Sequence, residues 1–253
     1  MRALLLATAM ATGLGLAAAV QAQEETPTIA HRAWSFDGVF GAFDRGAAQR
    51  GFQVYKEVCS VCHSLNLLAY RNLEEIGFTP DEVKAIAAQV QVTDGPNDQG
   101  EMFQRPGKPA DHFKPPFAND QAARVANNGA LPPDLSLMVK ARKGGPDYAY
   151  AILTGFVEPP AGYKVNEGMY YNAAFPGHQI AMPPPLSEGA VTYADGTNAT
   201  ALQMAHDVVT FLAWAADPNL ETRHRVGVKV ILYVLALTGL FFAVKRRVWA
   251  SVH

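Results

Sequence analysis

Apolar residues recur at spacings of three and four over much of this chain, which predicts helices, and the two-residue alternation of strands is almost absent. After Asp44, a residue type that favours a helix N-cap, this spacing continues up to Val58 and predicts one helix. Gly51 lies within it. A glycine there costs about 1 kcal/mol relative to alanine, so it marks either the close approach of another helix or a tolerated substitution.

Further helices are predicted along the chain. One begins at Thr79 and Pro80, two short ones occupy residues 135–142 and 147–154, and one is capped by Thr197 or Asn198 and stops before Asp217. Prolines exclude long regular elements between residues 94 and 133, and a second long loop runs to residue 186. The aromatic-rich residues 30–43 lack a period and predict an extended lead-in packed on the domain. The predicted fold is therefore mainly α with long loops rich in proline and glycine.

Residues 226–244 are apolar apart from Lys229 and Thr238. At 1.5 Å per residue such a helix is roughly 28 Å long, close to the thickness of a bilayer's hydrocarbon core. A buried helix of a soluble domain is the alternative. The basic cluster of residues 245–247 favours a cytoplasmic position for the tail, residues 245–253, although Arg223 and Arg225 on the other flank weaken that signal.

The first 22 residues have the features of an export signal. Arg2 provides a positive start, an apolar run follows, and small residues near Ala22 offer a cleavage site. An uncleaved membrane anchor is the alternative. We therefore predict four parts: a signal peptide at 1–22, an exported domain at 23–222, a transmembrane helix at 226–244 and a tail at 245–253.

Charge changes this picture further. The 253 residues have a formal net charge of −2, but residues 23–222 contain 14 Lys and Arg against 23 Asp and Glu, a charge of −9. A domain this acidic attracts a basic protein and predicts no nucleic-acid partner. A group of acids forms either part of a docking face or an ordinary solvated surface. Its members are Glu74, Glu75, Asp81, Glu82, Asp94, Asp98 and Glu101.

The chemistry of the chain centres on Cys59-Ser60-Val61-Cys62-His63, since a C-x-x-C-H run is the attachment signature of a covalently bound c-type haem. Two thioether bonds would hold the porphyrin and His63 would reach the iron. A redox dithiol, half of a zinc site and a chance match are the alternatives. Covalent haem is attached outside the bacterial cytoplasm, in agreement with the export signal. The chain has only these two cysteines, so none remains for a disulfide.

A second iron ligand would close the site for electron transfer, and His/Met ligation raises the potential. Prolines directly after Met182 hold an extended backbone that can present a thioether. Met138 and Met204 lie in helical patterns and are expected in the core, while Met169, Met102 and His178 remain as other candidates.

Several segments in this order resemble the cytochrome c1 family of bacterial type. They are residues 50–55 leading into 58–65, residues 127–136 (NNGALPPDLS), residues 141–145 continuing to 155, residues 175–184 (FPGHQIAMPP), residues 209–216 and the C-terminal anchor. Every c-type cytochrome has the C-x-x-C-H run, but this succession of segments is specific.

The resemblance implies a class I cytochrome c-like core with one covalently bound haem c. It implies that His63 and Met182 ligate the iron and that Arg142 and Tyr148 contact the haem propionates. Some bacterial relatives have a disulfide near the ligand loop, which this chain lacks the cysteines to form.

The implied function is that of a redox subunit, not an enzyme on its own, in a ubiquinol:cytochrome c oxidoreductase (the cytochrome bc1 complex). It would pass one electron from a Rieske iron-sulfur protein to cytochrome c, beside cytochrome b and membrane lipid. Its single span would lie in the bacterial inner membrane, with the haem domain in the periplasm. A free-standing anchored cytochrome that feeds an oxidase or a reaction centre, and a haem peroxidase, are the alternatives.

Overall fold

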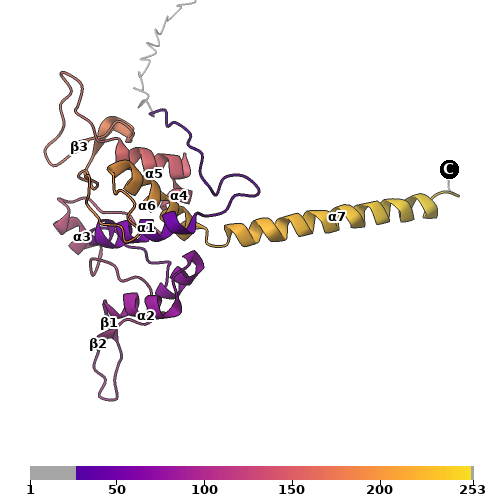
Figure 1. The fold of residues 1–253 in the computed structure, drawn as a ribbon, viewed down its shortest axis with the longest axis horizontal. Coiled ribbons are helices and arrows are strands. Elements are labelled where there is room, and N and C mark those ends of the chain that lie inside the picture. The colour runs from indigo at the N-terminus through magenta and orange to yellow at the C-terminus, as the bar shows by residue number, and fades with distance from the viewer. Residues whose placement is uncertain (1–26, 252–253) are drawn as a thin grey trace, which may run out of the picture.

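Two helices, α1 (Arg45–Glu57) and α6 (Ala201–Ala216), pack against each other at the centre of the structure, a computed structural model that describes residues 27–251 (Figure 1). Asp44 caps α1 as predicted, because its carboxylate accepts a hydrogen bond from the Ala47 backbone N–H at 3.0 Å. A Cβ on Gly51 would overlap the carbonyl group of Asp207, so only glycine allows the two backbones to meet there. The predicted close approach of another helix to Gly51 is confirmed.

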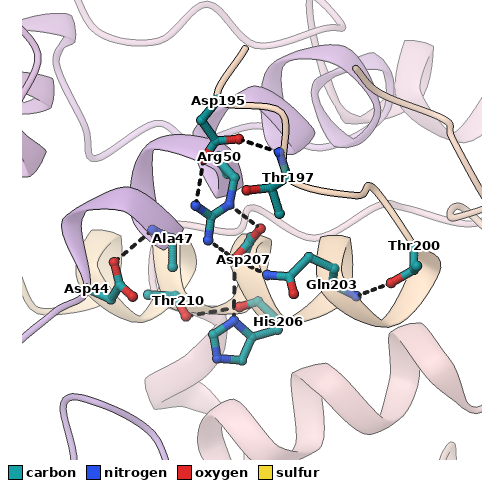
Figure 2. A network of polar contacts seen from close by, with 10 residues as sticks. All are labelled: Asp44, Ala47, Arg50, Asp195, Thr197, Thr200, Gln203, His206, Asp207 and Thr210. Atoms are coloured by element: carbon teal, nitrogen blue, oxygen red, sulfur yellow. Dashed lines mark hydrogen bonds and ion pairs between the residues drawn. The ribbon is translucent and has the colours of Figure 1, made fainter. Parts of the chain in front are cut away.

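A buried ion pair joins the same two helices (Figure 2). Arg50 Nε lies 2.8 Å from one carboxylate oxygen of Asp207 and Nη2 lies 3.1 Å from the other, while the Asp207 side chain is fully buried. Burial alone would raise the pKa of Asp207, but hydrogen bonds from His206, Arg50 and Gln203 outweigh it and lower that pKa. Arg50 also pairs with Asp195 in the loop before α6, at 2.9 Å. Arg50 therefore connects α1 both to α6 and to the loop before α6.

The lead-in segment packs on the domain, as the sequence predicts. The Trp34 indole N–H donates to Asp147 at 2.7 Å on α5 (Gly145–Thr154), and its ring stacks on His206 of α6 at 5.2 Å. Phe36 and Phe43 are buried, whereas Phe40 is 90% exposed.

The segment between residues 79 and 133 is more regular than the prolines indicated. The predicted helix start at Thr79 and Pro80 is confirmed, and Thr79 and Glu82 form a capping box at the beginning of α2 (Pro80–Ala88). The sequence did not predict the hairpin of β1 (Gln91–Asp94) and β2 (Phe103–Pro106), or α3 (Asp120–Ala126). Each element is short enough to fit between successive prolines. Arg105 stabilises the hairpin region by pairing with both Asp94 and Asp111.

Three predicted boundaries were wrong. Only α4 (Met138–Ala141) forms within 135–142, and α5 begins at Gly145 because Pro146 fits the first turn of a helix. Thr200, not Thr197 or Asn198, caps α6 by accepting from the Gln203 backbone N–H at 3.1 Å. The backbone N–H of Thr197 instead donates to Asp195 in a local turn at 2.9 Å.

The predicted fold class is confirmed: the molecule is mainly helical, and the strands within residues 27–251 form two small two-stranded sheets. The second sheet pairs β3 (Tyr170–Tyr171) with β4 (Gln179–Ile180). Short 3-10 turns complete the elements, namely η1 (Cys59–Val61), η2 (Tyr70–Ile76) and η3 (Pro176–His178).

The last helix, α7 (Leu220–Val248), leaves the domain as a single rod (Figure 1). It is longer than the predicted span and includes the basic residues on both flanks. Its most apolar 18-residue window has a mean hydropathy of 2.2 and no buried residue, so it is long and apolar enough to cross a membrane. The joint to the domain is short: Asp217 accepts from Arg223 at 2.7 Å and pairs with Lys140 at 2.8 Å. The predicted signal at 1–22 lies outside the described residues.

Replacing Asp207 by alanine should strongly destabilise the domain, because Arg50 would keep its charge without its buried partner. We expect a loss of about 3–5 kcal/mol in the free energy of unfolding, measured by urea denaturation in detergent. Asp195→Ala removes the exposed partner of the same arginine and should cost less than about 1 kcal/mol. Equal losses in the two variants would contradict the proposed importance of the buried pair.

The same comparison gives a pH dependence. Because the folded-state pKa of Asp207 is lowered, its stabilising contribution is present above the unfolded-state pKa and is lost as the pH falls through the folded value. The stability difference between wild type and the Asp207→Ala variant should therefore shrink below the usual carboxyl range.

Candidate functional site

The C-x-x-C-H motif lies directly after α1. The helix ends at Glu57, and the 3-10 turn η1 brings the backbone N–H groups of Cys62 and His63 to the Cys59 carbonyl at 3.1 and 2.9 Å. This turn sets the spacing of the two thiols. Burial raises the pKa of the Cys59 thiol to about 12, with a further contribution from Cys62. Redox dithiols have lowered pKa values, so this environment disfavours the redox alternative.

His63 is oriented by a backbone carbonyl. Its Nδ1 lies 2.8 Å from the Pro133 oxygen, and because a carbonyl only accepts, Nδ1 donates the proton and Nε2 keeps its lone pair. Burial lowers the pKa of His63 despite the opposing effect of this hydrogen bond. A neutral imidazole with a free Nε2, whose other nitrogen is fixed by an outer hydrogen bond, is the form that binds a metal. Together with two adjacent thiols, this donor set fits a covalently attached haem.

Asp134 joins the motif to the segment that holds His63. Its carboxylate accepts from the Ser64 hydroxyl and the Asn66 backbone N–H, both at 2.8 Å, and from the Ser136 backbone N–H at 2.8 Å. Burial would raise the pKa of Asp134, but these hydrogen bonds lower it overall. Sequence reasoning did not single out Asp134 or Pro133, although both lie in the 127–136 segment that carries the resemblance.

Arg142 and Pro133 line the same hollow, of about 300 Å³, with Leu67, Leu137 and Met138 among its other walls. Tyr148 on α5 lies near Arg142: burial raises the pKa of Tyr148, and the positive charge of Arg142 opposes this rise. Arg142 is therefore close enough to Tyr148 for its charge to act on the phenol, and it shares a hollow with Pro133, whose carbonyl orients His63. A larger hollow of about 410 Å³ contains none of the predicted site residues.

Met182 follows strand β4 and is half-buried. The loop that carries it is organised by Asn172, whose side chain is fully buried. The Asn172 amide donates to the Ile152 carbonyl at 2.8 Å and accepts from the backbone N–H groups of Ala174 and Phe175 at 3.0 and 3.2 Å. A side-chain amide thus connects the Met182 loop to α5 in a chain that has no disulfide for this purpose. Nothing in the sequence indicates this role, because one asparagine in a long loop has no distinguishing pattern.

The other ligand candidates occupy different settings. Met204 is fully buried in the core and Met138 packs against the core, as predicted. Met102 is 61% exposed near the β1–β2 hairpin. His178 is half-buried and stacks on Tyr171 at 5.6 Å between ring centroids. Met182 and Met169 remain as half-buried methionines on the loop. Between residues 27 and 251, no group of three or more His, Cys, Asp or Glu side chains is placed to hold a metal ion.

Comparison with known proteins shows the family of this chain. The profile described as the cytochrome C1 family matches residues 34–252. A cytochrome c1 of Rhodospirillum rubrum is 48% identical and covers 94% of both chains, and the mitochondrial cytochrome c1 1, heme protein, of Arabidopsis thaliana is 52% identical over 87% of this chain and 71% of its own.

A Bradyrhizobium diazoefficiens protein named cytochrome b/c1 is also 48% identical, over 99% of this chain, although the match spans only 40% of that longer protein. With a profile that matches most of its length and relatives near 50% identity, this chain belongs to the cytochrome c1 family.

Proposed function

We propose that this chain is the haem-bearing electron-transfer subunit of a ubiquinol:cytochrome c oxidoreductase. The observation that carries the proposal is the His63 imidazole, which is neutral, fixed at Nδ1 by Pro133 and adjacent to Cys59 and Cys62. One haem c, when bound, supplies a one-electron Fe(III)/Fe(II) couple. Electrons then pass without any bond being made to a substrate.

Each site residue has a separate task in this proposal. Cys59 and Cys62 would form the thioether bonds, and His63 Nε2 and the Met182 thioether would ligate the iron, a pair of ligands that raises the potential. Arg142 and Tyr148 hold the propionates. The arginine suits this task because its guanidinium forms two charge-assisted hydrogen bonds to one carboxylate and stabilises that charge.

The partners follow from the family. The Bradyrhizobium relative carries both names, cytochrome b and c1, in one protein, which supports cytochrome b as the neighbour of this chain. A Rieske iron-sulfur protein is the proposed electron donor and cytochrome c the acceptor.

The proposed topology combines the export signal with α7. Residues 1–22 direct export, 23–222 form the periplasmic domain, 226–244 cross the inner membrane, and 245–253 remain in the cytoplasm. The last turn of α7 contains Lys245, Arg246 and Arg247, which supports this orientation.

The formal charge of −9 on residues 23–222 supports docking of a basic acceptor. Two of the seven acids proposed for the docking face already have structural roles, since Glu82 caps α2 and Asp94 pairs with Arg105. The docking proposal therefore rests on the other five, Glu74, Glu75, Asp81, Asp98 and Glu101.

Complex purified in detergent through a tag on this chain should contain cytochrome b and an iron-sulfur protein. Its rate of reducing a basic cytochrome c should fall as salt rises, because salt shortens the Debye length to about 8 Å at physiological ionic strength. Isolation of this chain alone with its full haem content would favour a free-standing cytochrome. A rate indifferent to salt would contradict electrostatic docking.

Neutralising the five acids tests where the acceptor docks. A matched control removes five charges elsewhere, with Glu57, Glu158, Glu167 and Glu188 replaced by glutamine and Asp120 by asparagine, all of which are exposed. We expect the rate of reducing a basic cytochrome c to depend less on salt in the variant without the five acids than in the control. Equal slopes in the two variants would contradict docking at those acids.

Replacing Met182 by leucine should lower the midpoint potential by on the order of 0.1 V or more, since axial ligands tune haem potentials over about 0.8 V. The open iron should also bind carbon monoxide. Met169→Leu alters the other half-buried methionine of the loop and should change neither property. Redox titration and carbon monoxide difference spectra measure both effects, and the reverse pattern would move the ligand to Met169.

Replacing Asn172 by alanine should loosen the Met182 loop before it unfolds the domain, because three backbone groups would lose their partner. We expect a loss of about 1–3 kcal/mol in stability. The methionine-to-iron absorption band of the oxidised protein should disappear at lower urea concentration than the helical signal. Asn166→Ala, an exposed residue of the same loop, is the control and should leave the two transitions as in wild type. Coincident transitions in the Asn172 variant would contradict a specific role in the ligand loop.

A further inference from the structure

An ordered loop before α1 presents two apolar side chains to solvent. Val39 is 62% exposed and Phe40 is 90% exposed, whereas the aromatic residues around them, Trp34, Phe36 and Phe43, are buried. Single exposed apolar residues are common on proteins, but here the chain buries every neighbouring aromatic and displays one. We call Val39 and Phe40 the loop tip.

The loop is built to hold the tip outward. Backbone hydrogen bonds close it from Ala42 to Ser35 at 3.0 Å and from Gly41 to Gly38 at 3.3 Å. The Phe36 and Phe43 rings pack at its base with their centroids 5.1 Å apart. A Cβ on Gly41 would overlap the Phe36 backbone, so the two sides of the loop are in close contact. The base is therefore packed tightly, and the tip lies outside it.

The loop is attached to the beginning of α7. The Phe43 backbone N–H donates to Glu221 at 3.0 Å, and Arg45 pairs with the same carboxylate at 3.0 Å. In Figure 1 the indigo segment before α1 bulges in the direction in which α7 leaves the domain.

The lengths of the connecting segments allow the loop tip to reach the membrane. From Glu221 to Val226, where the proposed span begins, α7 rises about 7.5 Å. The three residues from Phe43 to Phe40 reach up to roughly 10 Å when extended. Phe40 can therefore reach the depth at which the first apolar residues of α7 enter the bilayer.

We infer that the loop tip inserts into the headgroup region of the bilayer that α7 crosses. This inference rests on the proposed membrane span. Aromatic and aliphatic side chains are stabilised at that depth, and Arg225 on the adjacent turn of α7 attracts anionic headgroups. The domain then has two points of attachment, a helix through the membrane and a loop on its surface, and together they set its tilt.

The inference can be tested by measuring the depth of a nitroxide label. The full-length holoprotein is placed in vesicles of phosphatidylethanolamine and phosphatidylglycerol, and a single new cysteine is introduced as Phe40→Cys, Val125→Cys or Leu235→Cys. Val125 is the matched control, since it is 85% exposed on α3, on the side of the domain away from α7 (Figure 1). Leu235 lies in the middle of α7 and reports on the span itself. Collisions with oxygen, which concentrates in lipid, and with a water-soluble nickel chelate are measured for each label.

The label at position 40 should have clearly fewer chelate collisions and more oxygen collisions than the label at position 125, with both values between those at 125 and 235. A label at 40 as open to the chelate as at 125, with 235 in lipid, overturns the inference and leaves the span intact. A label at 40 shielded from both reagents means that protein, such as a second copy of the chain, covers the tip, and this also overturns it. Chelate access at 235 would overturn the span and the inference together.

Discussion

The architecture depends on how closely α1 and α6 approach at Gly51. Without a Cβ at this position the two backbones touch, and Arg50, the preceding residue, reaches the fully buried Asp207 on the facing helix. A charge buried at such a contact is tolerated only because its partner is fixed beside it. Since α1 also ends at the C-x-x-C-H motif, the helix contact determines where the two thiols and His63 lie.

Two polar side chains then organise the two halves of the site. Asp134 fastens the segment that orients His63, and Asn172 fastens the loop that carries Met182. Both satisfy backbone groups that would otherwise be buried without partners, which costs more than the hydrogen bonds themselves contribute. The Met182 loop has no disulfide and is connected to α5 through hydrogen bonds to the Asn172 amide. Unlike a disulfide, these bonds fix the path of the loop without any oxidation or reduction.

The sequence predicted the features that depend on local chemistry. Asp44 caps α1 and α2 begins at Thr79 and Pro80 as expected, and Gly51 marked a helix contact before its partner was known. Prediction from the sequence failed where several residues could serve as the same helix cap, as at Thr197 and Thr200. The backbone of Thr197 bonds to Asp195 instead, and Thr200 caps α6. The importance of Asn172 could not be recognised in the sequence, since the partner that connects it to α5, the Ile152 carbonyl, lies 20 residues away. The placement of Arg142 beside Tyr148 likewise came from family resemblance and not from any local pattern.

The short joint before α7 has a consequence for how such a protein would work. Asp217 bonds to Arg223 of α7 and Lys140 of α4, and Glu221 of α7 bonds to the backbone of Phe43, so the domain is braced against the base of its own anchor. A braced domain cannot swing between a donor and an acceptor as if on a tether. The redox centre would stay at a constant height above the lipid, and the donor and acceptor proteins would have to diffuse to it.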